Sequence, residues 1–259
     1  MDKNKNLRLR IAEIIYKSGE GHIPSAYSLV EILSVLYGEF LKFQSKRPDW
    51  PGRDYFILSK GHGCAALYVI LEQYGFITKK DLRGKGQPGS ILGGHPDASR
   101  IPGVEASTGS LGHGIVTAMG IALGLKIKRK QNRVVVLIGD GESNEGTVWE
   151  TALVAANLKL GNFLVIVDEN GSTARVLPVP EMDKKWASFG WEVYNVDGHS
   201  EKNIGKILSK LKFKLNGKPK VIIAHTIKGK GVSFIEGDSA WHSRVPNGEE
   251  MENIRKELL

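Results

Sequence analysis

The stretch Val134-Val135-Val136-Leu137-Ile138-Gly139-Asp140-Gly141-Glu142 is an apolar run that ends at an acidic residue between two glycines. An ionised carboxylate at the end of a buried strand is costly unless another group satisfies it. Flanking glycines let the backbone turn sharply or approach a ligand closely. The stretch therefore predicts a buried strand over 134–138, followed by an acid that caps a helix, accepts hydrogen bonds or holds a metal.

Strands and helices alternate along most of the chain. Continuous apolar strands between amphipathic helices are typical of a parallel sheet with both faces covered. We therefore expect a three-layer α/β/α fold with a mostly parallel sheet, in a single domain over 1–259 with a loop-rich N-terminal third and a tail from about 231. The predicted strands are 55–58, 134–138, 163–167, 191–196 and 221–224, and the predicted helices are 25–40, 64–74, 111–126, 147–158, 182–189 and 202–215.

Composition narrows the class of protein. The apolar runs are too short to span a bilayer, the first ten residues are polar, and Cys64 is the only cysteine, so we expect a cytoplasmic protein without a membrane partner. The formal net charge is +8. The basic residues are scattered along the sequence, and the dense run Lys126–Lys130 falls where a helix is predicted to end, so we expect no nucleic-acid partner.

Polar side chains follow two consecutive strands. Asp140 comes after the second predicted strand, and Asn170 comes shortly after the third. Ligands bind beyond the carboxyl ends of the strands in an open parallel sheet. One carboxylate, one amide oxygen and a backbone carbonyl form part of the oxygen shell that suits Mg²⁺. A helix cap at Asp140 and a simple turn at Asn170-Gly171 are the alternatives.

Histidines lie beside glycines at several points. His22, His62, His95 and His113 each have a glycine neighbour in a predicted loop or helix start, and His242 lies in the tail. A neutral imidazole can donate a hydrogen bond to phosphate or hydroxyl groups and can transfer protons near neutral pH. This distribution favours a polar pocket.

In their order along the chain, these motifs resemble those of the transketolase family. The resemblance covers essentially the whole chain, but only the N-terminal, diphosphate-binding part of transketolase, as in enzymes that are split into two polypeptides. The motifs that carry it are Gly21-His22, Ser59-Lys60-Gly61-His62, Gly94-His95-Pro96, Ser107-Thr108-Gly109-Ser110-Leu111-Gly112, Gly139-Asp140-Gly141 with Asn170, and Ile227-Lys228-Gly229-Lys230-Gly231.

The resemblance implies a site for thiamine diphosphate and a divalent metal. Asp140, Asn170 and the backbone carbonyl of Ser172 would hold Mg²⁺, or Ca²⁺ or Mn²⁺ in its place. The predicted cofactor-binding residues are His62, Gly109, Ser110, Leu111, Gly139, Asp140, Gly141, Glu142, Asn170, Ser172 and His242. In this set, the turn at 109–111 would lie against the aminopyrimidine, and the N–H of Gly141 would reach the diphosphate.

The resemblance also implies catalytic roles. His22, His62, His95 and His242 would line the substrate channel and transfer hydroxyl protons. Glu145 and Glu150 match acids that lie between subunits and link the two cofactors of an assembly.

The implied activity is the transfer of a two-carbon ketol unit from a ketose to an aldose, either of which can carry phosphate. The glutamate that activates the cofactor belongs to a pyrimidine-binding domain, for which 259 residues leave no room. We therefore expect a partner subunit resembling the C-terminal part of transketolase, in an α2β2 heterotetramer. The alternatives are the α subunit of a 2-oxoacid dehydrogenase and a non-catalytic regulatory protein that binds Mg²⁺ and diphosphate.

Three positions depart from the family pattern. Ala174 replaces a branched apolar residue, His113 stands where glutamine is usual, and Ile23-Pro24-Ser25-Ala26 follows His22. Pocket shape sets specificity through modest energies, so these departures leave the identity of the sugars open.

Overall fold

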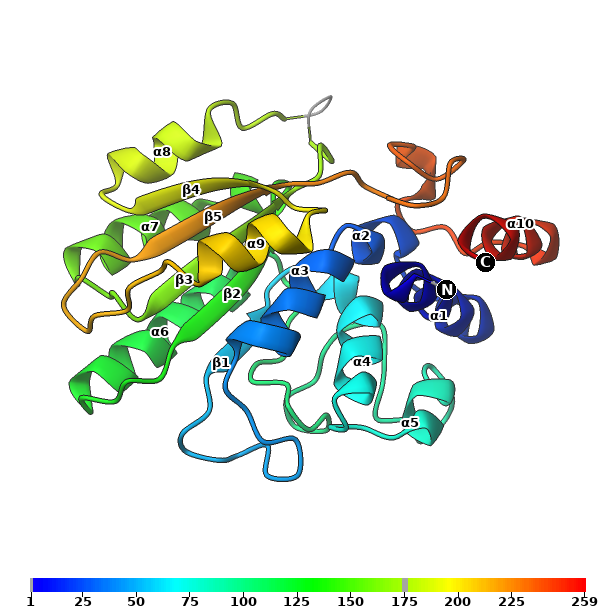
Figure 1. The fold of residues 1–259 in the computed structure, drawn as a ribbon, viewed down its shortest axis with the longest axis horizontal. Coiled ribbons are helices and arrows are strands. Elements are labelled where there is room, and N and C mark those ends of the chain that lie inside the picture. Colours follow the sequence, from blue (N-terminus) through cyan, green and yellow to red (C-terminus); the bar gives the residue numbers. More distant parts are fainter. Residues whose placement is uncertain (1, 174–176) are drawn as a thin grey trace.

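A five-stranded parallel sheet forms the centre of the structure (Figure 1). This computed structural model describes residues 2–173 and 177–259. The strand order is β1-β2-β3-β5-β4, and every neighbouring pair is parallel. The predicted mostly parallel sheet is therefore confirmed. The strands are β1 (Tyr55–Leu58), β2 (Val134–Gly139), β3 (Phe163–Glu169), β4 (Glu192–Asp197) and β5 (Lys220–His225).

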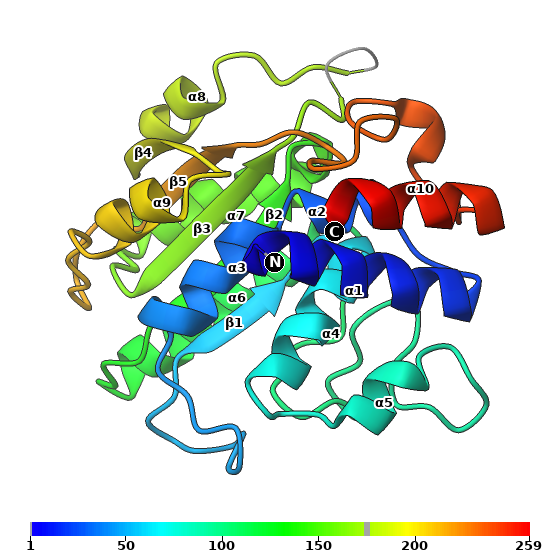
Figure 2. The ribbon, with the colours of Figure 1, turned by 45° about the vertical axis from the view of Figure 1, so that its right-hand side comes forward.

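Helices cover both faces of the sheet and complete the three predicted layers. One apolar core lies between one sheet face and α1 to α4, α9 and α10, and a second lies between the other face and α6 to α8. Helices α1 and α10 lie side by side, although they come from opposite ends of the chain (Figure 2). The helices are α1 (Lys3–Ser18), α2 (Ile23–Tyr27), α3 (Val30–Val35), α4 (Cys64–Gln73), α5 (Lys79–Arg83), α6 (His113–Ile127), α7 (Gly146–Asn157), α8 (Met182–Ser188), α9 (Glu201–Leu208) and α10 (Gly248–Leu258).

The central strands are apolar without alternation because both of their faces are covered. Every residue of β2 is buried, and so is β3 as far as Asp168. In the register of this pair, Gly139 lies opposite Asp168. The residues that follow the two strands therefore leave the same edge of the sheet, as the sequence predicted for Asp140 and Asn170.

The single helix predicted over 25–40 is wrong. The segment forms α2, a break at Ser28-Leu29, α3 and a π-helical turn over Leu36–Phe40. Ser25 lies inside α2, and His22 occupies the position before it. At the break, the Ser28 hydroxyl donates a hydrogen bond to the buried Asp168 carboxylate at 2.7 Å. A tertiary contact thus interrupts a segment whose local pattern is helical.

Two other features of the fold differ from the prediction. Helix α9 ends at Leu208 instead of reaching 215, and Phe213 beyond it packs against Phe40 with ring centroids 5.9 Å apart. The first third of the chain, expected to be rich in loops, also contains helices α1 and α5, which were not predicted. In the described residues no helix is both long enough and apolar enough to span a membrane.

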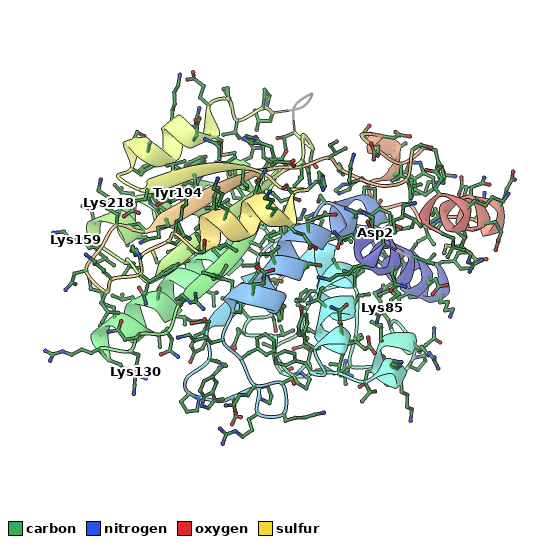
Figure 3. The ribbon with its side chains drawn as sticks, viewed as in Figure 1. Asp2, Lys85, Lys130, Lys159, Tyr194 and Lys218 are labelled. Carbon is green, nitrogen blue, oxygen red and sulfur yellow. The ribbon has the colours of Figure 1, made fainter. Side chains whose placement is uncertain are left out.

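The positive charge partly gathers at the edge of the sheet where the strands begin. Lys130, Lys159 and Lys218 lie in the loops that precede the neighbouring strands β2, β3 and β5, and their side chains extend from the same end of the molecule (Figure 3). Asp140 lies at the opposite end of β2. These lysines are therefore too far from Asp140 to neutralise it.

Candidate active site

A cavity of about 460 Å³ lies at the carboxyl ends of the strands. It contains most of the residues that the sequence singled out. From the predicted set, the wall includes His22, His62, His95, Gly109, Leu111, Gly139, Asp140, Gly141, Glu142, Asn170, Ser172 and His242, and it also includes Lys60, Thr173, Lys228 and Ser239.

Asp140 supplies the negative charge of the wall. It is only 5% exposed, and the Gly141 N–H donates to its carboxylate at 2.7 Å. Burial raises the pKa of the Asp140 carboxyl, and the nearby Asp168 carboxylate raises it further. No Lys, Arg or His among the described residues forms an ion pair with Asp140. A divalent cation bound at this carboxylate would provide the missing positive charge.

A buried network beside Asp140 fixes Asn170. The Asp168 carboxylate is fully buried and forms an ion pair with Lys60. It also accepts from the Asn170 amide at 2.9 Å and from the Thr226 hydroxyl. Because the amide nitrogen of Asn170 faces Asp168, the amide oxygen points away, where it accepts from the Ser172 N–H at 3.0 Å. The Ser172 hydroxyl donates to the same oxygen, so Asn170 would exchange one of these hydrogen bonds for a metal ion on binding it.

The donor set fits a metal that prefers oxygen. The described residues contain no group of three or more His, Cys, Asp or Glu side chains with a geometry that could hold a metal ion. A transition-metal centre of that kind is therefore absent from them. The carboxylate of Asp140 and the amide of Asn170 line one cavity, which matches a Mg²⁺ that takes its remaining ligands from phosphate and water.

Three histidines form a cluster in the wall of the cavity. The ring centroids of His22 and His62 are 5.4 Å apart, those of His22 and His242 are 5.3 Å apart, and those of His62 and His242 are 5.9 Å apart. Burial and neighbouring positive groups lower the pKa of His22 to about 4 and that of His62 to about 2. Both imidazoles are therefore neutral near pH 7 and can accept or donate a hydrogen bond at a hydroxyl group.

Two lysines that were not predicted as site residues add positive charge to the wall of the cavity. The Lys228 ammonium lies 2.9 Å from Nδ1 of His242, and burial lowers the pKa of Lys228. Lys60 is 1% exposed and faces Asp168. Both lysines belong to motifs quoted above, but their sequence positions alone do not distinguish a pocket lysine from a surface one.

Two predicted cofactor-binding residues, Glu142 and Ser110, form hydrogen bonds to other groups of the protein. The Glu142 carboxylate accepts from Ser59 and from the Gly112 N–H at 2.8 Å, so it joins the loop before α6 to the end of β2. Ser110 does not line the cavity, and its hydroxyl pairs with His113 at 3.2 Å. Gly109 and Leu111 of the same turn do line the cavity, and the role of Ser110 in binding the cofactor stays a prediction.

The two glutamates predicted to be catalytic lie outside the cavity. Glu145 precedes α7 and Glu150 lies on it, and both are exposed. Their predicted roles would therefore require another subunit. His113 is also exposed and outside the cavity, while Ala174 lies outside the described residues.

Comparison with known proteins identifies the family. The family model for the transketolase thiamine diphosphate-binding domain matches residues 2–258. The chain belongs to the transketolase family. It is 38% identical to an apulose-4-phosphate transketolase subunit of Phocaeicola vulgatus, an alignment that covers all of this chain and 92% of that protein. It is also 34% identical to human transketolase, over 99% of this chain and 41% of that protein.

A solved structure supports the same assignment. The transketolase of Campylobacter jejuni matches this transketolase domain with a TM-score of 0.91 and 31% identity, over 100% of this chain and 43% of that one. The domain thus spans about two fifths of the full-length transketolases and nearly all of the Phocaeicola vulgatus protein. The predicted family, fold and transferase class are confirmed, and the domain is of the type that binds thiamine diphosphate.

The histidine cluster predicts a pH-dependent stability of the isolated transketolase domain. Unfolded histidine binds a proton near pH 6.5, whereas burial and nearby positive groups lower the pKa of His22 to about 4 in the folded chain. The unfolded state therefore binds more protons between these values, and the free energy of unfolding should fall as the pH drops from 6.5 to 4. Urea unfolding at several pH values measures this slope.

The variant His22→Gln should flatten this slope by up to about 1.4 kcal/mol per pH unit, and by less where solvent screens the group. His62→Gln should act in the same direction, because burial lowers the pKa of His62 as well. An unchanged slope in both variants would show that the cluster takes up its protons in the folded state.

Proposed function

We propose that this chain is the subunit of a two-chain transketolase that binds thiamine diphosphate and Mg²⁺. With a pyrimidine-binding partner, it would transfer a two-carbon ketol unit from a ketose to an aldose, each of which can be a sugar phosphate. One observation carries this proposal: Asp140 and Asn170 follow neighbouring strands and line the same cavity as Lys228 and the histidines. The same cavity therefore combines oxygen donors for a metal with a lysine and imidazoles for a diphosphate.

Different residues of the cavity would bind the metal and the diphosphate. Asp140, Asn170 and the backbone carbonyl of Ser172 would hold Mg²⁺, with Ca²⁺ or Mn²⁺ as possible substitutes. Lys228, His62 and His242 would face the diphosphate, and the N–H of Gly141 would donate to it. Thiamine diphosphate, when bound, supplies the electron sink for breaking and forming a carbon–carbon bond.

The histidines would handle the substrate protons. His22 and His62 are neutral at pH 7 because burial lowers the pKa of each ring. For proton transfer, the negative charge of a bound diphosphate would have to raise the pKa of these rings toward the working pH. His95 lines the cavity close to Gly109, where a Cβ added to that glycine would lie 3.1 Å from the His95 ring. The turn at Gly109 and the His95 ring therefore pack directly against each other.

An exposed apolar face supports assembly with further chains. Helices α6 and α7 leave several large apolar side chains exposed to water. This is unusual, because the outer face of a helix on a protein surface is normally polar. We propose that this face lies between subunits of an α2β2 heterotetramer, which would also bury Glu145 and Glu150. The most exposed apolar side chains on and just after α6 and α7 are Val116, Ile127, Leu153, Val154 and Leu158.

The remaining expectations are part of the same proposal. The family match over residues 2–258 supports a single diphosphate-binding domain. We also propose a cytoplasmic location, where sugar phosphates are metabolised. The transketolase family match disfavours the α subunit of a 2-oxoacid dehydrogenase. The remaining alternative is a non-catalytic protein that binds Mg²⁺ and diphosphate, and a measurement of activity distinguishes it from the proposed enzyme subunit.

We expect activity only when both chains are present. The purified chain is mixed with a candidate pyrimidine-binding chain, thiamine diphosphate and Mg²⁺, and ketol transfer from a ketose is followed by product analysis. The mixture should exceed either chain alone by at least about 100-fold, the usual range for supplying a missing acid–base group. Turnover by this chain alone would contradict the need for a partner, and cofactor binding without turnover in any mixture would support the non-catalytic alternative.

A further inference from the structure

A buried charged group lies outside the cavity, where α1, α3 and the loop before α9 meet. The Arg8 guanidinium contacts both oxygens of the Glu31 carboxylate, at 2.8 and 2.9 Å, and each residue is 5% exposed. Nδ1 of His199 lies 3.0 Å from the same carboxylate. None of the three residues lines the cavity, and none was selected from the sequence.

The surroundings of His199 define its protonation. The backbone N–H of Ile227 donates to Nε2 of His199 at 2.8 Å. A backbone amide can only donate, so Nε2 carries no proton. Nδ1 therefore carries the proton of the neutral ring and donates it to Glu31. Burial raises the pKa of the Glu31 carboxyl, but the hydrogen bonds from His199 and Arg8 outweigh burial and leave this pKa lowered, so Glu31 is ionised and can accept.

The cluster of Arg8, Glu31 and His199 contacts both ends of the loop that carries Lys228. At one end, Ile227 donates to His199. At the other, Arg8 packs against Gly231 so closely that an added Cβ would lie 2.9 Å from Cδ of Arg8. Between them, the Gly229 N–H donates to the Pro24 carbonyl of α2 at 3.0 Å.

These contacts link Lys228 to the histidine side of the cavity. Helix α2 begins directly after His22, and Arg8 donates to the carbonyl of its last residue, Tyr27, at 3.3 Å. The loop and α2 are thus attached to one buried ion pair. Movement of the loop by an ångström would break the 2.9 Å contact between Lys228 and His242.

We propose that His199 is a positioning residue, which fixes the loop over 226–231 through its bond to Ile227 and so keeps Lys228 directed into the cavity. The inference rests on the proposed function for the role of Lys228 toward diphosphate. With Nδ1 held by Glu31, the ring presents Nε2 as the acceptor for the Ile227 N–H. His199 thereby acts on the ligand through Lys228 and touches no ligand itself.

Two conservative variants test separately the hydrogen bonds of His199 to Glu31 and to Ile227. His199→Asn can keep a donor to Glu31 but is too short to reach Ile227. His199→Gln has one donor and one acceptor at the spacing of the two ring nitrogens. Hydrogen exchange followed by mass spectrometry should show exchange at least about fivefold faster over 226–231 in His199→Asn, with much of the protection restored in His199→Gln.

His225 provides the matched control. It precedes the same loop, but its ring contacts the side chains of Glu169 and Asn195 and no backbone group of the loop. His225→Asn should leave exchange over 226–231 unchanged. Equal exchange in wild type and a folded His199→Asn variant would overturn the inference, and so would equal acceleration by His225→Asn.

Binding measurements test the route through Lys228. Calorimetry with the full chain, thiamine diphosphate and Mg²⁺ should show about fivefold weaker binding for His199→Asn and for Lys228→Gln. If His199 acts through Lys228, the double variant should bind no more weakly than Lys228→Gln alone. Additive losses would overturn the inference. Unchanged binding by Lys228→Gln would instead refute the proposed role of Lys228, while the exchange experiment would still decide whether His199 fixes the loop.

Discussion

Asp140→Asn should abolish the Mg²⁺-dependent part of thiamine diphosphate binding. Asp140 is the single carboxylate in the proposed ligand set, and asparagine keeps its shape without its charge. We expect at least about 100-fold weaker binding, because losing even a group behind a metal ligand costs about 10- to 100-fold. Calorimetric titration with and without Mg²⁺ measures the effect, which should be a large Mg²⁺-dependent gain in wild type and none in the variant.

The same variant should not destabilise the metal-free chain. Burial and the adjacent Asp168 raise the pKa of Asp140, so the charged form is disfavoured in the folded protein. A neutral amide removes that cost, and the free energy of unfolding should stay equal or increase. Asp49→Asn, at an exposed position before β1, is the matched control and should change neither property. Unchanged cofactor affinity in Asp140→Asn would mean that Asp140 only caps the turn after β2.

Lys60→Met should cause the largest loss of stability of the variants considered. Lys60 and Asp168 form an ion pair in which the side chains are 1% and 0% exposed. Removing one partner of a buried pair leaves an uncompensated charge and costs about 3–5 kcal/mol. Urea unfolding of the chain near pH 7 measures this loss, and a double variant Lys60→Met/Asp168→Asn should recover part of it.

An exposed pair supplies the comparison. Lys230 and Glu236 are 3.5 Å apart with side chains 38% and 32% exposed, so Lys230→Met should cost less than about 1 kcal/mol. Similar losses for Lys60→Met and Lys230→Met would contradict the importance of the buried pair. Failure of the double variant to recover any stability would show that the other donors to Asp168 depend on its charge.

Much of the fold was predictable from local pattern. The apolar runs at 55–58 and 134–138 form β1 and β2 nearly as predicted, because a strand covered on both faces needs a continuous run of such residues. The end of the sheet that holds the site was predictable for the same reason. Parallel strands end at one edge, so the acid after β2 and the amide after β3 had to emerge together.

The errors in the fold arose where a tertiary contact outweighed local preference. The helical pattern over 25–40 is broken at Ser28, whose hydroxyl satisfies a carboxylate 140 residues away. The helix expected to reach 215 ends at Leu208, after which Phe213 packs against Phe40. In both cases the competing partner is distant in sequence, so the local pattern contains no trace of it.

By itself, the sequence determined the strands, the edge of the sheet at which the cavity lies, and the motif residues Asp140, Asn170 and His62 that line it. Only the tertiary structure decided which charges meet: Lys60 with Asp168 across 108 residues, and His199 with the Ile227 amide. It also separated Glu145 from the cavity that contains Glu142. The physical reason is that strand formation depends on neighbouring side chains, whereas burying a charge depends on a partner that only the folded chain brings within hydrogen-bonding distance.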